Sequence, residues 1–279
     1  MPIKLPKWST REMRYAHLEE HISRLRTTCF GFRKIPVEDK TRRVLQHFNR
    51  VAQKYDLMNT ILSFGIHHLW KRQAVRLLDL KAGNLVIDVC GGTADLSILA
   101  ADAVGDTGCI IVYDINRSMI QAGVQKLKAL TVRHPIRFVQ ADAERISFPD
   151  ELFDAAMVGF GIRNVTRMEK CFEEMYRVLK PGGKLMCLEF SKPANPYFCR
   201  LYDLYSFYCM PLLGSIIAGS SEPYACLSET IRTFLLPEEL VAVLERIGFS
   251  SVSYRKLTWG IAAVHIGIKP INLRLRVVA

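Results

Sequence analysis

The segment Leu85-Val-Ile-Asp-Val-Cys-Gly-Gly-Thr-Ala-Asp-Leu-Ser97 decides the fold of this chain. Apolar residues on both sides of Asp88 indicate a buried strand, Gly91-Gly92 predicts a tight turn, and the residues from Thr93 onward favour a helix. Glycine lets a ligand approach the backbone closely, and the first N–H groups of a helix have no partner within it. This segment therefore predicts a cradle for the polar groups of a ligand.

Strands and helices alternate from this segment onward. We expect strands over residues 85–90, 110–114, 136–140, 154–159, 184–190, 250–257 and 261–268. We expect helices over residues 93–103, 118–130, 167–179 and 237–247. Such alternation predicts a mainly parallel sheet with helices on both faces. The short turn Thr258-Trp259-Gly260 predicts that the last two strands form a hairpin, which leaves one strand antiparallel at the sheet edge.

The composition is that of a globular protein with a basic surface. The 279 residues suffice for one large domain, with 49% hydrophobic and 23% charged residues. The net charge of +11 fits nucleic acid, an anionic membrane surface or an acidic ligand, and by itself selects none of them. The eight cysteines form no CxxC pair and no zinc-type spacing, so we expect a reducing, cytoplasmic location and no metal site.

The chain divides into a main domain and flanking segments. We expect a basic appendage over residues 1–37, a main domain over 38–270 and a tail over 271–279. Within the main domain, residues 38–80 predict a helical lid and residues 191–236 an aromatic insertion over the substrate site. We expect the appendage to be partly helical from Arg11 to Arg26 and to pack loosely or onto a partner. Trp259 and the insertion are most simply interpreted as core.

Two local predictions concern helices outside the alternating region. Asp39 is a candidate N-cap for a helix that carries Val44, Phe48, Val51 and Tyr55 on one face. No apolar run has the length of a transmembrane helix, because Pro211 and Gly214 interrupt the nearest one, residues 207–218.

An acidic residue accompanies each of the first three predicted strands. Asp88 precedes a glycine turn that is neither the dinucleotide GxGxxG nor a phosphate-binding loop with its lysine. Asp114 ends the second strand, where nucleotide folds bond ribose hydroxyls, and Asp142-Ala143 follows the third. Together these features resemble the class I S-adenosylmethionine methyltransferases. The resemblance implies that the glycine turn approaches the methionine part, Asp114 holds the ribose and Asp142 reaches the adenine.

Two longer patterns resemble signatures of the ubiquinone/menaquinone C-methyltransferases. One is Tyr55-Asp56-x-Met-Asn-x-x-Leu-Ser-x-x-x-His67-x-x-Trp70, and the other runs from Arg177 through Lys-Pro-Gly-Gly to Ser191. The segments 160–165, 202–207 and 263–265 match as well, and the resemblance extends from about residue 38 to residue 270. It implies a Rossmann-like class I methyltransferase fold with a seven-stranded sheet and S-adenosyl-L-methionine as the cofactor.

The sequence departs from the family pattern at three places. Ala94 replaces the glycine that usually precedes the final Asp of the turn, so we expect the backbone to approach the ligand less freely. Gly159 stands where the family usually has a small hydroxyl residue that lines the cofactor. Phe234-Leu-Leu-Pro237 replaces the usual Phe-Pro.

The resemblance also assigns candidate site residues. The cofactor-binding candidates are Asp88, Gly91, Gly92, Thr93, Asp114, Asp142, Ala143 and Gly159. The catalytic candidates are Arg163, Asn164, His67, Tyr55 and Asp56. Arg163 and Asn164 lie just beyond a predicted strand, where open α/β sheets bind ligands, whereas His68 most simply caps or packs.

The implied reaction is C-methylation of a polyprenylated quinol in menaquinone or ubiquinone biosynthesis. The reduced quinol is the nucleophile, and we expect Arg163 with Asn164 to stabilise its phenolate, directly or through a water, while His67, Tyr55 or Asp56 carries the proton. Two alternatives stay open: a methyltransferase of RNA or another substrate, and a non-catalytic scaffold. Against RNA, the sequence shows no separate RNA-binding module and no Asn-Pro-Pro-Tyr-like tetrapeptide.

The implied substrate carries a tail that resides in a bilayer. We therefore expect the basic surface to hold the protein peripherally at the anionic inner face of a membrane, with the aromatic insertion as an apolar lid. The sequence leaves a homodimer open.

Overall fold

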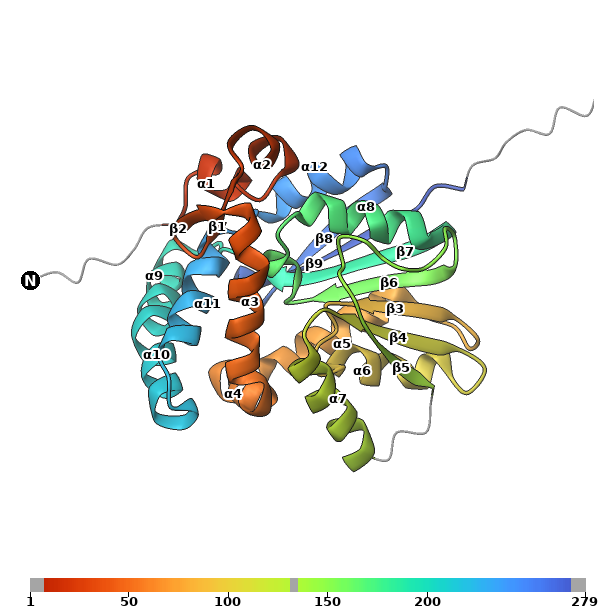
Figure 1. Cartoon of the computed structure of the whole chain (residues 1–279), viewed down its shortest axis with the longest axis horizontal. Helices are drawn as coiled ribbons and strands as arrows, with labels where there is room; N and C mark the ends of the chain where they lie inside the picture. The colour runs from red at the N-terminus through yellow and green to blue at the C-terminus, as the bar shows by residue number, and fades with distance from the viewer. Residues whose placement is uncertain (1–7, 131–134, 272–279) are drawn as a thin grey trace, which may run out of the picture.

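The computed structural model describes residues 8–130 and 135–271 and places a seven-stranded sheet at the centre of the molecule (Figure 1). The strand order is β5-β4-β3-β6-β7-β9-β8. The strands are β3 (Leu85–Val89), β4 (Cys109–Asp114), β5 (Ile136–Gln140), β6 (Phe153–Gly159), β7 (Leu179–Phe190), β8 (Ser250–Leu257) and β9 (Ala262–Ile268). Strands β3 to β7 pair in parallel, and β9 pairs antiparallel with both β7 and β8. The predicted mainly parallel sheet and the closing hairpin are confirmed.

Helices cover both faces of this sheet (Figure 1). One face carries α5 (Ile66–Leu78), α6 (Asp95–Val104) and α7 (Arg117–Ala129), and the other carries α8 (Met168–Val178) and α12 (Pro237–Ile247). Successive side chains of a strand point to opposite faces. Accordingly, Val86 packs among residues of α5 and α6, whereas its neighbour Ile87 packs among residues of α8 and α12.

Strand β7 is longer at its N-terminal end than the sequence predicts. A tight turn forms at Lys180-Pro-Gly-Gly183, with Gly182 at a φ of +83°. Its residues nevertheless count as strand, and the register with β6 jumps from Phe153 opposite Leu179 to Ala155 opposite Lys184. Strand β7 therefore begins five residues earlier than the predicted 184–190.

The N-terminal segment packs against the main domain, which contradicts the loose packing expected for it. The prediction that it is partly helical from Arg11 to Arg26 is confirmed by α1 (Arg11–Tyr15) and α2 (Glu19–Leu25), and an unpredicted hairpin of β1 (Thr27–Phe30) and β2 (Arg33–Pro36) follows. Leu18 and Ile22 are buried, and Leu18 belongs to the core formed with α8 and α12. An ion pair of 2.7 Å joins Arg14 to Glu239 of α12. Residues 1–7 and 272–279, which include most of the predicted tail, lie outside the described residues.

The prediction of Asp39 as an N-cap is wrong. Helix α3 (Val37–Val51) begins after Pro36, so Asp39 lies within its first turn and pairs with Arg42 at 2.6 Å. Proline, whose fixed φ suits a helix start, supplies the boundary here. The predicted apolar face of this helix is confirmed for Val44 and Phe48, which line a cavity at the carboxyl ends of the strands. The 3₁₀ turn η1 (Ala52–Lys54) and α4 (Tyr55–Leu62) follow.

The aromatic insertion forms a helical layer beside the sheet. It comprises α9 (Pro196–Leu204), η3 (Tyr205–Cys209), α10 (Met210–Leu213), η4 (Gly214–Ala218) and α11 (Glu222–Thr233). Pro211 and Gly214 do not interrupt it, in contrast to the prediction. The π-helical turn η3 precedes Pro211 and η4 begins at Gly214, and such turns accommodate a break in the regular hydrogen-bond ladder.

The result is one helix of 23 residues, Pro196–Ala218, which is long and apolar enough to cross a membrane by length and composition, with 28% of its most apolar window buried. Trp259 also departs from the prediction: it is 72% exposed rather than part of the core.

Candidate active site

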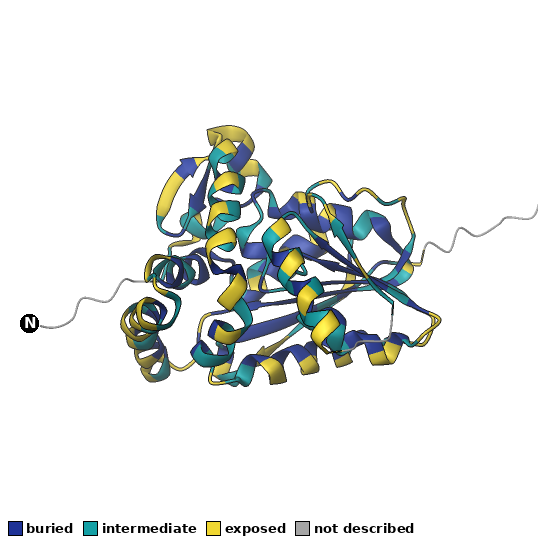
Figure 2. Cartoon of the chain, turned by 60° about the horizontal axis from the view of Figure 1, so that its bottom comes forward, coloured by how far each residue is buried: buried dark blue, intermediate teal, exposed yellow. Residues whose placement is uncertain are grey.

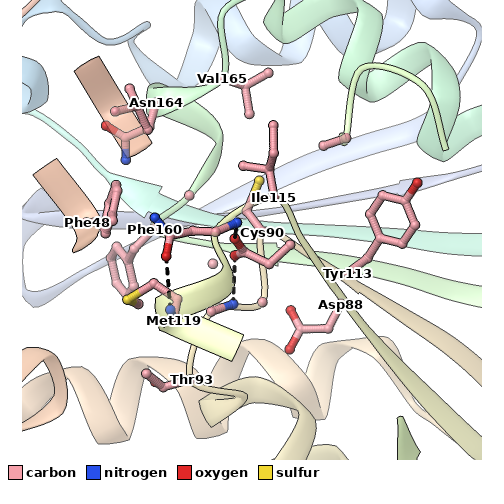
Figure 3. A pocket seen from close by; sticks show the side chains of 18 of the residues that line it. Phe48, Asp88, Cys90, Thr93, Tyr113, Ile115, Met119, Phe160, Asn164 and Val165 are labelled. Atoms are coloured by element: carbon pink, nitrogen blue, oxygen red, sulfur yellow. Dashed lines mark hydrogen bonds between the residues drawn. The ribbon is translucent and has the colours of Figure 1, made fainter. Parts of the chain in front are cut away.

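Two cavities adjoin at the carboxyl ends of the parallel strands, where open α/β sheets bind ligands. The first, which we call the acidic cavity, measures about 110 Å³ and is lined by Asp88, Asp114, Asp142 and Glu144 around the glycine turn (Figure 3). The second, the apolar cavity, measures about 550 Å³ and is lined by residues of α3, α4, α5, α9 and α11. The residues that line both cavities are Phe48, Tyr55, Lys71 and Phe160. These four side chains form the common wall.

All eight predicted cofactor-binding residues line the acidic cavity. Gly91 is required there, because a Cβ atom at this position would lie 2.8 Å from the carbonyl oxygen of Asp88 and 2.8 Å from Val112. The N–H of Gly92 donates to the Asp114 carboxylate over 2.9 Å, and Gly92 has a φ of +51°. The turn is therefore held against the end of β4 by a direct hydrogen bond.

Asp114 presents a partly desolvated carboxylate to the cavity. Its two oxygens accept the N–H groups of Gly92 and Asn116, at 2.9 and 2.7 Å. Burial raises the pKa of Asp114 to about 6, although these two hydrogen bonds lower it. Further hydrogen bonds from hydroxyl groups would stabilise the charged form of this carboxylate, and a ribose supplies such hydroxyl groups.

Asp88 lies deeper, at the end of β3. Its side chain is fully buried, and one oxygen accepts the hydroxyl of Ser97 over 2.7 Å. The other oxygen, Oδ1, has no hydrogen-bond partner among the described residues. Burial raises the pKa of Asp88 to about 7. An unpartnered buried oxygen at a cavity wall is suited to accept a hydrogen bond from a ligand.

The structure gives a physical account of two of the three departures from the family pattern, Ala94 and Gly159. Ala94 is fully buried and adopts a left-handed conformation with a φ of +67° as the N-cap of α6. It does not line the acidic cavity, so its effect is on the backbone rather than on the approach of a ligand. At Gly159, an added Cβ would lie 2.6 Å from Cδ1 of Leu96, so Leu96 occupies the room that a larger residue would need.

An ion-pair network that the sequence did not reveal joins the helices around the turn. Asp95, the first residue of α6, pairs with Lys71 of α5 and with Lys126 of α7, each at 2.5 Å. Burial disfavours the charge of Asp95, but the two ammonium groups prevail and lower its pKa. Lys126 also pairs with Asp56 at 2.7 Å, and the other Asp56 oxygen accepts the hydroxyl of Thr93. Asp56 is therefore engaged on both oxygens and ties α4 to the glycine turn.

Arg163 lies in the short turn η2 (Ile162–Asn164) and lines the apolar cavity but not the acidic one. It is 8% exposed, and its Nη1 donates to Glu189 over 2.7 Å and to the carbonyl oxygen of Phe160 over 2.5 Å. Its guanidinium carbon lies 5.2 Å from the centre of the Phe190 ring. Glu189 is a residue that the sequence interpretation missed, although an acid inside an otherwise apolar strand is a recognisable signal.

The structure separates Asn164 from Arg163. Asn164 lines the acidic cavity, and its Nδ2 is buried without a hydrogen-bond partner among the described residues (Figure 3). The two residues share only a third, small cavity of about 20 Å³. A volume of this size holds one water molecule. That Arg163 and Asn164 act together on a phenolate, directly or through a water, stays a prediction, and this small shared cavity is where such a water would lie.

His67 and Tyr55 both line the apolar cavity. His67 is buried, its Nε2 lies 3.2 Å from the hydroxyl of Thr60, and its Nδ1 has no hydrogen-bond partner in the described part of the chain. Burial lowers the pKa of His67 to about 4, so the imidazole is neutral near pH 7. Burial raises the pKa of Tyr55, which keeps its hydroxyl protonated. His68 also approaches the Thr60 hydroxyl, at 3.3 Å, but does not line the cavity.

The acidic cavity fits S-adenosyl-L-methionine, the cofactor that the sequence resemblance implies. Carboxylates suit its hydroxyl, amino and sulfonium groups, and the buried amide of Asn164 and the carboxylate of Asp88 both have atoms free for a ligand. The glycine turn leaves the space that a side chain would fill. Three of the four common-wall residues, Phe48, Tyr55 and Phe160, are aromatic, and aromatic rings stabilise a nearby cation.

Comparison with known proteins identifies the family. The ubiE/COQ5 methyltransferase family matches residues 36–269. The chain is 47% identical to the "Ubiquinone/menaquinone biosynthesis C-methyltransferase UbiE" of Stutzerimonas stutzeri and 48% identical to the protein of that name from Pseudomonas fluorescens, each time over 88% of this chain and 95% of the relative. A solved SAM-dependent methyltransferase from Aquifex aeolicus shares the fold, with 18% identity and a TM-score of 0.52 over 71% of this chain and 89% of that one. The chain belongs to the ubiE/COQ5 methyltransferase family.

Proposed function

We propose that this protein transfers a methyl group from S-adenosyl-L-methionine to a ring carbon of a polyprenylated quinol. The observation that carries the proposal is the common wall of Phe48, Tyr55, Lys71 and Phe160 between the acidic cavity and the apolar cavity. The two cavities adjoin at these side chains, so a cofactor in the first cavity and a quinol ring in the second would lie next to each other there. The names of the relatives, which are C-methyltransferases of ubiquinone and menaquinone biosynthesis, support the same reaction.

The chemistry requires an electron-rich ring next to a methyl donor. When bound, S-adenosyl-L-methionine supplies an electrophilic methyl group on a sulfonium. The quinol ring becomes a stronger nucleophile when a phenolic proton leaves, but a phenol has a pKa of about 10 in water. A donor fixed beside the phenolic oxygen favours the phenolate. Arg163 is a cationic donor that lines the apolar cavity and does not belong to the common wall. Glu189 and the carbonyl oxygen of Phe160 hold its guanidinium in place.

The proton acceptor on the quinol side is best matched by His67. Its Nδ1 has no hydrogen-bond partner among the described residues and is therefore open to a proton, although burial lowers the pKa of His67 to about 4 and makes the imidazole a weak base. The other candidates are less suited, because Tyr55 holds its own proton tightly and both oxygens of Asp56 are already hydrogen-bonded. Asn164 contributes from the acidic cavity, where its amide would contact the cofactor rather than the quinol.

The test is methyl transfer by the purified protein. The full chain is incubated with methyl-labelled cofactor and, separately, with a reduced demethylmenaquinol and a reduced polyprenyl-methoxy-benzoquinol, and the products are identified by mass spectrometry. We expect a ring-methylated product from at least one quinol and none from the oxidised quinones, which are electrophilic. Cofactor binding without any methylated product would favour a scaffold, and neither binding nor product would overturn the proposal.

We also propose that the protein works at the cytoplasmic face of a membrane. The substrate tail is apolar, and the chain has a net charge of +11, which suits an anionic lipid surface. Flotation with anionic vesicles at low ionic strength tests the association, and recovery of all the protein at the bottom of the gradient would argue against it.

A further inference from the structure

The helix Pro196–Ala218 presents an apolar stripe to solvent. The stripe comprises Tyr197, Leu201, Leu204, Tyr208, Leu212 and Ile216, whose exposures range from 39% to 80%. Their spacings of three and four residues place them on one side of the helix. Figure 2 shows exposed turns along the outer side of the helical layer formed by the insertion.

The opposite side of the same helix is a packed interface. Cys199, Tyr202, Ser206 and Met210 are buried there, and buried Asp203 pairs with Arg232 at 2.5 Å. The helix is therefore packed onto the domain by one face, and none of the described residues covers its exposed apolar face. A contiguous exposed apolar surface on a folded protein marks an interaction site.

The charges on the helix favour a lipid surface as the occupant. Arg200 and Asp203 are its two charged residues. Arg200 is exposed, whereas Asp203 is buried, so the exposed side carries apolar side chains and one cation without an anion. An exposed apolar stripe with a cation and no exposed anion beside it suits the interface of an anionic bilayer, where the apolar side chains lie among the acyl chains.

The apolar cavity opens beside this stripe. Leu201 is 60% exposed and Phe64 is 83% exposed, yet both line the cavity, so they mark its mouth. Exposed Trp259 packs edge-to-face on Phe198, another cavity residue, with ring centres 4.8 Å apart. The cavity mouth and the stripe consequently form one continuous apolar surface.

We propose that this surface, defined by the six stripe residues with Phe64 and Trp259, inserts into the outer acyl region of an anionic phospholipid bilayer. The inserted mouth lets a quinol ring enter the apolar cavity while its tail stays in the lipid. The inference rests on the proposed function for the identity of the cavity's ligand. The docking face itself follows from exposure, helix geometry and charge.

The test compares two triple variants of the full chain. The stripe variant carries Tyr197→Gln, Leu212→Gln and Ile216→Gln, three exposed residues that do not line the apolar cavity. The control variant carries Leu25→Gln, Leu130→Gln and Ile271→Gln, which are exposed apolar residues of other segments. Binding is measured by flotation with vesicles of phosphatidylcholine and phosphatidylglycerol at low and high salt.

We expect the stripe variant to lose vesicle affinity by about tenfold or more while the control variant binds like the wild type. High salt should weaken the wild type only partly, because insertion is apolar. The part of the tryptophan fluorescence that a Trp259→Phe variant lacks should shift to the blue and be quenched by brominated lipid. Equal binding of the stripe variant and the wild type would overturn the proposal. Loss of all wild-type binding at high salt, or a stripe-dependent self-association without vesicle binding, would overturn it as well.

A second readout separates this inference from the proposed function. The stripe variant should methylate a short-chain, water-soluble quinol at the wild-type rate but lose activity toward a long-chain quinol embedded in vesicles. Inactivity of the wild type toward every quinol would contradict the proposed function, and vesicle binding would still decide whether the surface docks on lipid.

Discussion

Nη1 of Arg163 lies 2.7 Å from Oε1 of Glu189, and the two side chains are only 7% and 1% exposed. The pair joins η2, the short turn after β6, to the end of strand β7. Burial raises the pKa of Glu189, and the Arg163 guanidinium opposes this shift. Because the carboxylate fixes the guanidinium, Arg163 is a rigid donor at the wall of the apolar cavity rather than a mobile surface cation.

The first prediction concerns the loss of Arg163. Arg163→Ala should lower kcat for the quinol by roughly a hundredfold to a thousandfold, because it removes a fixed donor to the phenolate. The dissociation constant of S-adenosyl-L-methionine should stay within about twofold, because Arg163 does not line the acidic cavity. Single-turnover kinetics and calorimetric titration measure the two quantities. An undiminished kcat would remove Arg163 from the mechanism.

Removing its partner should act differently. Glu189→Leu leaves the buried guanidinium without a counterion, and we expect a loss of about 3–5 kcal/mol in the free energy of unfolding. Glu189→Gln keeps a carbonyl acceptor for Nη1, so it should lose less stability and retain part of kcat with an unchanged KM. Denaturant titration and steady-state kinetics of both variants provide the comparison. Equal stability of the Leu variant and the wild type would show that the pair is not needed to hold Arg163.

The sequence predicts the sheet, its closing hairpin and the wall of the acidic cavity well, because these features follow from local patterns. Asp88, Asp114 and Asp142 each stand at or just after the end of an apolar run, and the parallel topology then brings them together. The three-strand acidic pattern and the glycine turn are therefore readable without coordinates.

Contacts between elements that are far apart in the chain could not be predicted from the sequence. Lys71 and Asp95 are 24 residues apart, and Arg163 and Glu189 are 26 apart, so neither pair has a helical or strand spacing. The N-terminal hairpin was also missed, although Thr27-Thr-Cys-Phe30 is rich in strand-forming residues and Gly31 supplies its turn. The sequence predicts core for the exposed stripe, because apolar composition alone does not distinguish a buried helix face from an exposed one.

Cofactor affinity should depend on pH through Asp114. Since burial raises the pKa of Asp114 to about 6, the carboxylate loses its charge as the pH falls through that value, and its hydrogen bonds to cofactor hydroxyls weaken. We expect the dissociation constant to rise on acidification by roughly tenfold. For stability the sign is opposite: a folded pKa above the unfolded one stabilises the fold at low pH, and this contribution disappears as the pH rises through about 6.

Asp114→Asn is the matched variant for this prediction. It should bind the cofactor more weakly near pH 8 and lose the step centred near pH 6, leaving only the weaker dependence of Asp88, whose pKa is about 7. Calorimetric titrations across this range measure both curves. An unchanged step in the Asn variant would assign the pH dependence to another group.

Ala94 should tolerate glycine, unlike an ordinary buried alanine. Its φ of +67° costs about 1 kcal/mol in an L-residue, and glycine removes this cost while adding chain entropy to the unfolded state. We expect Ala94→Gly to stay within about 1 kcal/mol of the wild type in unfolding free energy. Ala100→Gly, at a fully buried site inside α6, should lose about 1–2 kcal/mol. Equal losses for the two variants in denaturant titrations would contradict the backbone explanation.

Gly159 and Leu96 should behave as a coupled pair. A Cβ at position 159 would lie 2.6 Å from Cδ1 of Leu96, so Gly159→Ser, which restores the residue type usual in the family, should cost about 1–3 kcal/mol through overpacking. Leu96→Val alone should also destabilise, because Leu96 is 4% exposed and its loss leaves a small cavity. In the double variant the smaller side chain makes room for the serine, so its unfolding free energy should exceed the additive expectation by about 1 kcal/mol or more. A double-mutant cycle in denaturant measures the coupling. Strict additivity would show that a backbone shift at position 159 removes the clash with Leu96. In that case Leu96 does not determine which residue fits at position 159 in the acidic cavity.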